Sequence, residues 1–297
     1  MQVVNSYTSF PGSVTSLALD ALSTGAKATY KGVFACKLVI GAYAGYCFRL
    51  GNSGNTKSED FYADSTGNLT SSGNLTSGTA GQSLATWTTS QSFTGLYYVY
   101  TWYDQSGNGT AAQSLISNCP VYDSTNKLVD FRSSVTGVTT SHLVFGSPNI
   151  VSGDGAYTMA VRHGLTTSTG WNGYVGAGQS ISNDCYYISS VNNANYQAGH
   201  WNNDTGLIAG TGIASGNKLC MTYNGGGSSG VITLYVNGSS LGTKVPTAVR
   251  NTLGNFGWIG AGQLTSGAGP YAQAQIYNVT LFNSVLSAGD RTIVDGQ

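Results

Sequence analysis

Short runs of alternating apolar and polar residues follow one another along the chain, and glycine or asparagine separates them. In the segment 156–164, Tyr157, Met159 and Val161 fall on one face, because successive side chains of a strand point to opposite sides. Strand-length segments separated by turn residues are typical of an antiparallel β-sandwich. The predicted strand segments of the second half are 156–164, 171–179, 185–191, 217–225, 230–243, 256–262 and 272–287.

The first half shows fewer clear strands. Residues 95–104 and 127–133 are rich in β-branched and aromatic residues and predict two of them. Two short helices are expected, one over 13–23 and one over 284–296 with Ser287 as its N-cap. We therefore divide the chain into an N-terminal arm or docking segment, 1–30, and a single β-sandwich, 31–297.

The composition supports an all-β protein. Only 8% of the residues are charged, and Glu59 is the single glutamate, whereas helix surfaces are normally filled with Glu, Lys, Ala and Leu. The 40% of apolar residues, with 11% aromatic, are enough to build a core. The net charge is zero and no cluster of Lys or Arg occurs, which excludes nucleic acid as an expected partner.

The sequence also limits where the protein acts. No apolar run is long enough for a membrane span. The first residues lack both a charged n-region and an apolar h-region, so no secretory signal peptide is seen. The uncharged, hydroxyl-rich composition nevertheless resembles that of an extracellular surface. A protein made in the cytosol and displayed on a virion would reconcile the two observations.

Cysteines and sequons give little chemistry. The five cysteines have no metal-ligand spacing, so we expect buried, mostly reduced thiols, with Cys36–Cys47 as the best single disulfide candidate. No cofactor is expected, although a calcium ion on Asp184 or Asp204 stays open. The N-glycosylation sequons are no more frequent than chance allows in so Asn-, Ser- and Thr-rich a chain, and they lie at Asn68, Asn74, Asn108, Asn203, Asn237 and Asn278.

The string "WYDQSGNG", residues 102–109, is predicted to be a strand that runs into a tight turn. Trp102 ends the strand, and Asp104 can accept hydrogen bonds from backbone N–H groups just downstream as an Asx turn. Gly107 and Gly109 are expected to supply positive φ. A direct ligand contact by this string is the alternative.

A glycan site is the leading functional hypothesis for residues 171–204. Sugars bind to an aromatic plane flanked by amide or carboxylate groups, and this region contains both. Since strand side chains alternate, half of these aromatic residues are expected to face the core instead. The candidate glycan-binding residues are Trp171, Tyr174, Tyr186, Tyr187, Asn193, Tyr196, His200, Trp201, Asn202 and Asp204.

Two groups of segments resemble known families. Residues 42–55, 61–69 and 98–114 resemble the N-terminal half of the catalytic domain of the arabinofuranosidase B family, and also phage, bacterial and algal giant-virus proteins that carry the WYDQSGNG signature. Segments between 157 and 290 resemble laminin G-like domains of the concanavalin A-like lectin/glucanase superfamily. The resemblance implies an all-β, two-sheet antiparallel jelly roll.

The resemblance to arabinofuranosidases implies a Glu nucleophile and an Asp acid in the second half, together with an adjacent cysteine pair. This chain has no Glu and no adjacent cysteines there, so we expect no glycoside hydrolysis by this route. The aspartates of the second half are Asp154, Asp184, Asp204, Asp290 and Asp295.

The functional expectation is therefore a non-catalytic structural protein on the surface of a viral particle. It would be a capsid-associated, fibre or appendage subunit that contacts other subunits through the N-terminal arm and also contacts glycans. The alternative is a secreted, lectin-like or arabinofuranosidase-related protein. A stretch of aromatic and amide residues is common to both hypotheses.

Overall fold

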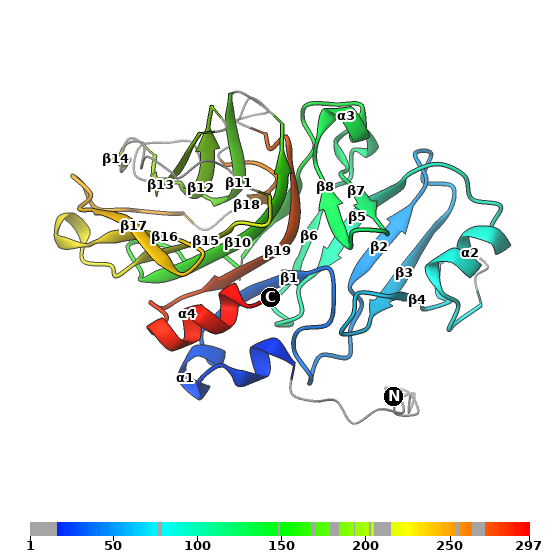
Figure 1. Cartoon of the computed structure of the whole chain (residues 1–297), viewed down its shortest axis with the longest axis horizontal. Coiled ribbons are helices and arrows are strands. Elements are labelled where there is room, and N and C mark those ends of the chain that lie inside the picture. The colour runs from blue at the N-terminus through cyan, green and yellow to red at the C-terminus, as the bar shows by residue number, and fades with distance from the viewer. Residues whose placement is uncertain are drawn as a thin grey trace.

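The computed structural model describes residues 17–75, 79–147, 149–167, 170–178, 184–192, 194–201, 203–204, 215–253, 256–262 and 271–297. Its strands form two packed layers, with a smaller sheet to one side (Figure 1). All strand pairings among these residues are antiparallel, so the predicted all-β antiparallel sandwich is confirmed.

The first layer, sheet I, includes the long strand near the C-terminus, as Figure 1 shows. Its strands run in the order β17 (Ser239–Lys244), β16 (Ile232–Val236), β15 (Lys218–Tyr223), β10 (Tyr157–Thr166) and β19 (Ala274–Phe282). On its other edge β19 pairs with two strands at different positions along its length. These are β1 (Tyr30–Ala35), toward the C-terminal end of β19, and β8 (Leu128–Asp130), toward its N-terminal end.

The second layer, sheet II, packs over sheet I. Its strands run in the order β14 (Asn203–Asp204), β13 (Asn195–His200), β12 (Tyr186–Val191), β11 (Trp171–Ala177), β18 (Gly257–Ile259), β9 (Leu143–Phe145) and β6 (Thr110–Ala112).

One strand, β5, joins the layers to the side sheet. On one edge β5 pairs with β6 of sheet II and with β7, which continues through β8 into sheet I. On the other edge it carries the side sheet. These elements are β5 (Tyr97–Tyr103), β7 (Val121–Asp123), β2 (Phe48–Gly51), β3 (Ser58–Ala63) and β4 (Leu69–Ser71).

The helices are short and peripheral. In Figure 1, α4 and α1 lie together below sheet I, and α2 lies beyond the side sheet. Among the described residues no helix is long and apolar enough to cross a membrane. The helical elements are η1 (Ala18–Ala21), α1 (Thr24–Lys27), α2 (Leu84–Ser90), η2 (Ile116–Asn118), α3 (Ser133–Thr136), η3 (Gly227–Ser229) and α4 (Ala288–Asp295).

Residues 17–30 of the predicted arm pack against the same chain. Leu19 and Leu22 belong to a buried cluster that includes Val294 of α4, and the backbone N–H of Ser23 donates to Asp290 over 2.8 Å. Residues 1–16 lie outside the described residues. Ser287 caps α4 as predicted, because its hydroxyl accepts from the N–H of Asp290.

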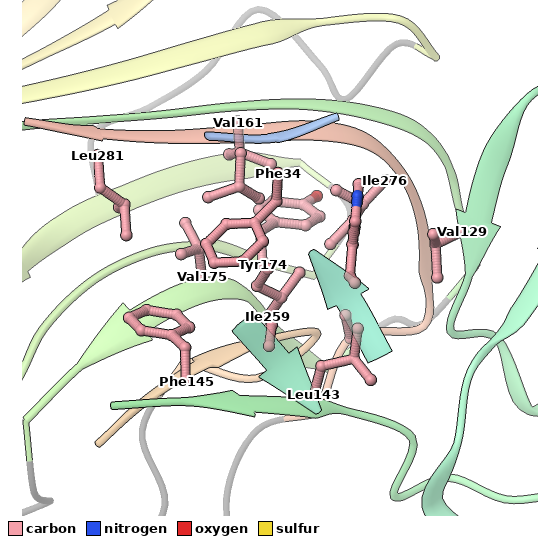
Figure 2. Close-up of a cluster of buried hydrophobic side chains, with 14 of the residues drawn as sticks. Phe34, Val129, Leu143, Phe145, Val161, Tyr174, Val175, Ile259, Ile276 and Leu281 are labelled. Carbon is pink, nitrogen blue, oxygen red and sulfur yellow. The ribbon is translucent and has the colours of Figure 1, made fainter. Parts of the chain in front are cut away.

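The core lies between the two layers and continues beneath the side sheet. Figure 2 shows its centre, where Phe34 of β1, Val161 of β10 and Ile276 of β19 face Tyr174 and Val175 of β11. Buried apolar side chains of this kind supply most of the free energy of folding.

The expected buried, reduced thiols are confirmed, because all five cysteines are free and buried, and the candidate Cys36–Cys47 disulfide is not formed. The Cys47 thiol donates to the Ala35 carbonyl over 3.1 Å instead of reaching a second sulfur. Burial raises the pKa of both thiols, which keeps them protonated and poorly reactive.

Two glycines of β11 allow another part of the backbone to lie directly on sheet II. A Cβ at Gly173 would come within 1.7 Å of the Gly262 nitrogen, and one at Gly176 would come within 1.8 Å of the Gly262 oxygen. Only residues without a side chain permit this approach.

We expect Gly173→Ala to lower the free energy of unfolding by about 1–3 kcal/mol or more, because backbone atoms cannot move aside for a methyl group. Gly25→Ala is the matched control, since nothing lies within 4 Å of its Cβ position and alanine favours a helix. Urea denaturation of the two variants tests this, and equal midpoints would contradict the packing described here.

Candidate functional site

Strand alternation divides the predicted glycan-binding residues into two groups. On β12, Tyr186 and Ile188 belong to the core cluster, whereas Tyr187 between them does not. On β13, Tyr196 and His200 point the same way as Ala198, into the sandwich. The structure therefore places Tyr174, Tyr186, Tyr196 and His200 inside the core, away from any glycan at the surface.

The inward-facing group forms buried hydrogen-bonded pairs rather than a binding site. The Tyr174 hydroxyl donates to Ser190 Oγ over 2.9 Å, and its ring stacks on His163 with centroids 4.6 Å apart. His163 Nε2 lies 2.8 Å from the Tyr196 hydroxyl, which also accepts from Asn217. A bulge between Gly173 and Val175 allows Tyr174 and Val175 both to face the core.

At the other end of the core a buried arginine lies among three tyrosines. The Arg250 guanidinium carbon is 4.7 Å from the Tyr186 ring centroid, 5.0 Å from that of Tyr157 and 5.8 Å from that of Tyr223. Arg250 is 1% exposed. Cation–π contacts of this kind offset part of the cost of burying the charge. Sequence reasoning missed Arg250, since a lone arginine carries no local signal.

The outward-facing group consists of Trp171, Tyr187 and Trp201, which we call the outer aromatic cluster. The rings of Trp171 and Trp201 are stacked with centroids 5.8 Å apart, and Tyr187 meets Trp171 edge-on at 5.6 Å. Both tryptophans are half-buried, and Tyr187 is buried. These three are the predicted residues that the structure brings together on the side of sheet II away from sheet I.

The outer aromatic cluster spans several residues along the strands. Trp171 pairs with Val191, which is four residues from Tyr187 and hence about 13 Å away along β12. Since the rings are much closer than this, the Trp171 side chain leans along the strand toward Tyr187. Gly173 and Gly199 lie in neighbouring positions of the same face, where the Gly262 backbone packs against Gly173.

Among the described residues, two polar groups beside the cluster have no partner. Ser189 pairs with Gln197 across β12 and β13, and its fully buried hydroxyl has no hydrogen-bond partner within the described part of the chain. The same holds for the buried indole N–H of Trp171. The pattern of aromatic residues did not reveal Ser189 or Gln197, although the two-residue period of β12 and β13 places them on the face of Tyr187.

Three candidate residues cannot be compared with this geometry. Asn193 and Asn202 lie outside the described residues. Asp204 is placed only through its backbone, where β14 pairs it with Gly199. Their part in the glycan site stays a prediction.

The described aspartates of the second half are held in separate structural contacts. Asp154 accepts from the Tyr223 hydroxyl over 2.6 Å, and Asp184 accepts from the N–H of Leu253 over 3.1 Å. Asp290 accepts from Ser23 at the start of α4, and burial raises the pKa of Asp295 to about 6. Glu59 is fully buried in the side sheet, where it accepts from Ser72.

Metal ligands do not gather in the described part of the chain, which has no group of three or more His, Cys, Asp or Glu side chains suited to an ion. Calcium takes six to eight oxygen ligands. One carboxylate oxygen of the buried Asp184 has no partner among the described residues, and the other accepts from Leu253. The expectation of no cofactor stays a prediction, and calcium at Asp184 or Asp204 stays the open alternative.

The string 102–109 forms a turn in which Asp104 is the central acceptor. Its carboxylate accepts from the backbone N–H of Ser106 over 2.8 Å and from that of Asn108 over 3.1 Å, as in an Asx turn. It also accepts from the N–H of Val33 over 2.7 Å and from the Asn149 side chain over 2.9 Å. The Trp102 indole donates to the Ala35 carbonyl, so the turn holds β1.

The two glycines of this turn have different roles. Gly107 has φ +79°, as predicted. The expectation of positive φ at Gly109 is wrong, since Gly109 is not among the described residues with positive φ. A Cβ at Gly109 would lie 2.5 Å from Asn149 Oδ1, so glycine is required there by close packing.

A family model described as the concanavalin A-like lectin/glucanases superfamily matches residues 135–290, which is more than half of the chain. The chain therefore belongs to this superfamily. A comparison with curated proteins finds no significant match.

Solved structures share the fold at low sequence identity. A GH54 α-L-arabinofuranosidase soaked with a cyclic sulfate inhibitor has a TM-score of 0.63 and 11% identity, over 92% of this chain and 63% of that chain. An arabinofuranosidase complexed with arabinofuranosyl-α-1,2-xylobiose has a TM-score of 0.63 and 12% identity, over 91% of this chain and 63% of that chain.

A Trypanosoma rangeli sialidase in complex with 2,3-difluorosialic acid has a TM-score of 0.50 and 16% identity, over 68% of this chain and 31% of that chain. The chain thus spans less than two thirds of the length of the arabinofuranosidases and less than one third of the sialidase. At these identities the likeness shows the fold, and it confirms the resemblance to arabinofuranosidases at that level. The predicted resemblance to viral proteins stays a prediction.

We expect Asp104→Asn to lower the free energy of unfolding by about 1–3 kcal/mol. The asparagine would place an NH2 group, which is a donor, where a carboxylate oxygen now accepts hydrogen bonds from N–H groups. Asp123→Asn is the control, since Asp123 makes a comparable Asx turn at the surface, with Thr125 and Asn126, where changes usually cost less than about 0.5 kcal/mol. Thermal denaturation at pH 7 measures both, and a loss at Asp104 no larger than at Asp123 would contradict this role.

The two core histidines should stay neutral in the folded protein at physiological pH. Burial lowers the pKa of His163 to about 4 and, together with the Arg250 charge, that of His200 to about 3. The unfolded chain takes up these protons below about pH 6.5, so this part of the stability is complete above that pH and is lost as the pH falls toward 4 and 3.

Burial of Asp295 acts in the opposite direction, because its raised pKa adds stability at low pH that is lost as the pH rises toward 6. The readout must therefore be residue-specific. In an NMR titration from pH 8 to pH 5, we expect the imidazole signals of His163 and His200 not to move. A midpoint near 6.5 for either histidine would show that its side chain is not enclosed as described.

Proposed function

We propose that this chain is a non-catalytic surface protein that contacts glycans through the outer aromatic cluster. The observation that carries the proposal is the juxtaposition of Trp171, Tyr187 and Trp201 on one face of sheet II. Aromatic rings offer an apolar plane to the C–H face of a sugar, and they keep their shape on binding because they have few rotatable bonds.

The polar atoms beside the cluster support a sugar more than a purely apolar ligand. The Ser189 hydroxyl and the Trp171 indole N–H lack partners among the described residues, and Gln197 lies across the strand pair from Ser189. An unpaired buried polar group costs free energy, and a ligand that rearranges the cluster and bonds to these atoms recovers it. Sugar hydroxyls donate and accept, so they suit such a mixed set.

The absence of catalysis is supported by the positions of the acids. A retaining glycosidase needs two carboxyl groups about 5–5.5 Å apart on either side of the bond to be cleaved. In the described second half, Asp154, Asp184 and Asp290 each accept hydrogen bonds in a different part of the fold, and Asp295 is buried in α4. The single glutamate, Glu59, lies in the side sheet, remote in the topology from β11–β13.

The setting that we propose is the surface of a viral particle, as a capsid-associated, fibre or appendage subunit. The low content of charged residues and the WYDQSGNG resemblance support it. In this setting residues 1–16 would contact a neighbouring subunit, since residues 17–30 already pack on this chain. A secreted, lectin-like protein is the second candidate, and the fold shared with arabinofuranosidases favours it.

We expect the wild-type chain to bind glycans on an array, and Trp201→Ala and Trp171→Ala each to weaken binding about fivefold. This reduction corresponds to the roughly 1 kcal/mol that an aromatic contact contributes. Tyr98→Ala is the matched control, because Tyr98 is a half-buried aromatic residue on β5, in another part of the fold. Near-UV circular dichroism confirms that each variant is folded.

Two results would contradict the proposal. A wild type that binds no glycan removes the sugar-contacting role and leaves only a structural one. Release of product from an aryl α-L-arabinofuranoside, abolished by Asp184→Asn, shows a catalytic carboxylate and removes the non-catalytic part.

A further inference from the structure

A separate cavity of about 330 Å³ lies where β1, the segment before β10 and the end of β19 meet. One part of its wall is apolar, with Ile150, Val151 and Ala156. The other part is lined by the polar residues Lys31, Ser152 and Asn283. The volume is at the lower end of the range of about 300–1,000 Å³ that is usual for small-molecule sites.

Lys31 reaches this cavity because it is the extra residue of a β-bulge. Along the β1–β19 pair, Tyr30 is opposite Phe282 and Gly32 is opposite Leu281, so Lys31 has no partner of its own. Bulges re-aim a side chain and are frequent beside functional sites.

The bulge is held by the turn that contains Asp104. The Asn149 side-chain amide donates to the Lys31 carbonyl, and it also donates to Asp104 Oδ2 over 2.9 Å. Gly32 allows Asn149 to lie this close, since a Cβ there would be 3.1 Å from Asn149 Nδ2. Rigid support of this kind fixes a binding group before the ligand arrives.

The opposite wall is held equally firmly. Arg250 donates to the Val151 carbonyl over 2.8 Å and to the Gly155 carbonyl over 2.6 Å. The N–H of Val151 donates to the Tyr186 hydroxyl over 3.0 Å. The buried tyrosines and Arg250 thus fix the backbone that lines the cavity.

The charged residue that lines the cavity is a cation. Lys31 is the one charged residue among those that line it, and its ammonium group has no hydrogen-bond or carboxylate partner within the described ranges. The nearby Asp104 carboxylate is buried and accepts from Val33, Ser106, Asn108 and Asn149. It forms no ion pair with Lys31.

We propose that this cavity binds the anionic group of an acidic saccharide, with the Lys31 ammonium paired to a carboxylate or a sulfate. Asn283 and Ser152 supply neutral hydrogen bonds to the same ligand, and the apolar wall of Ile150 and Val151 receives one face of the sugar ring. The site is distinct from the outer aromatic cluster and does not depend on it.

The test is an NMR titration of the full chain, at constant ionic strength, with glucuronate, glucose 6-sulfate and glucose in parallel. We expect saturable shifts of the backbone amides of Ser152, Gly155 and Asn283 with at least one of the two anions, and none with glucose. Lys31→Gln should weaken that binding about tenfold or more, because it removes a charge-assisted hydrogen bond. Lys244→Gln, on the edge strand β17, is the matched control and should leave it unchanged.

The pattern of shifts decides the outcome. Shifts with glucuronate alone, or with glucose 6-sulfate alone, support the site and identify which anion it prefers. Equal shifts with glucose, unchanged binding by Lys31→Gln in a variant with the wild-type spectrum elsewhere, or no shifts with any probe would overturn the proposal. A blank glycan array together with binding of glucuronate here would contradict only the role of the outer aromatic cluster.

Discussion

The buried carboxylate of Asp104 is the interaction on which the architecture depends most. Burying a carboxylate is costly unless donors surround it, and here backbone and side-chain donors from β1, the turn and Asn149 all converge on it. Asp104 directly follows β5, the strand that joins the two layers to the side sheet. Gln105 extends the same contact, because its amide accepts from Val39 and donates to the carbonyl of Lys37. One short string thus positions β1 in sheet I while β5 pairs in sheet II and the side sheet.

Local patterns predicted the strands and this turn because both depend on neighbouring residues. The two-residue period shows in β10, where Tyr157, Met159 and Val161 all face the core, and the Asx turn needs only acceptors and donors a few positions apart. The branching at β5 could not be predicted, since it depends on pairing with strands that are distant in sequence. The same holds for Gly109, whose reason is the contact with Asn149, and for Gly173, whose reason is Gly262.

The candidate site, like the fold, could be predicted from the sequence only in part. Alternation indicated that half of the aromatic residues at 171–204 would face the core, but which half depends on register and on the bulge in β11. The outer group combines residues of β11 and β12 with Trp201, which directly follows β13, so it depends on the pairing of three segments. Arg250 gave no signal at all, because its environment consists of tyrosines from β10, β12 and β15 that the fold alone assembles.

Because charged residues are scarce in this chain, the position of each one indicates whether it serves the fold or a ligand. Arg250, Asp104 and Glu59 are buried and hydrogen-bonded, so they serve the fold rather than a ligand. Between Arg162 and Lys218 the sequence contains no Lys or Arg, so the outer aromatic cluster has no cation from its own region with which to select an anion. A glycan bound there is therefore recognised through ring faces and neutral hydrogen bonds. Lys31, raised into a cavity by a bulge, offers the opposite chemistry at a separate place in the fold. A glycan that carries both neutral and acidic sugars would suit such a pair of sites. An anionic group finds no counterion on the aromatic face, and a neutral sugar in the cavity leaves the Lys31 ammonium unpaired.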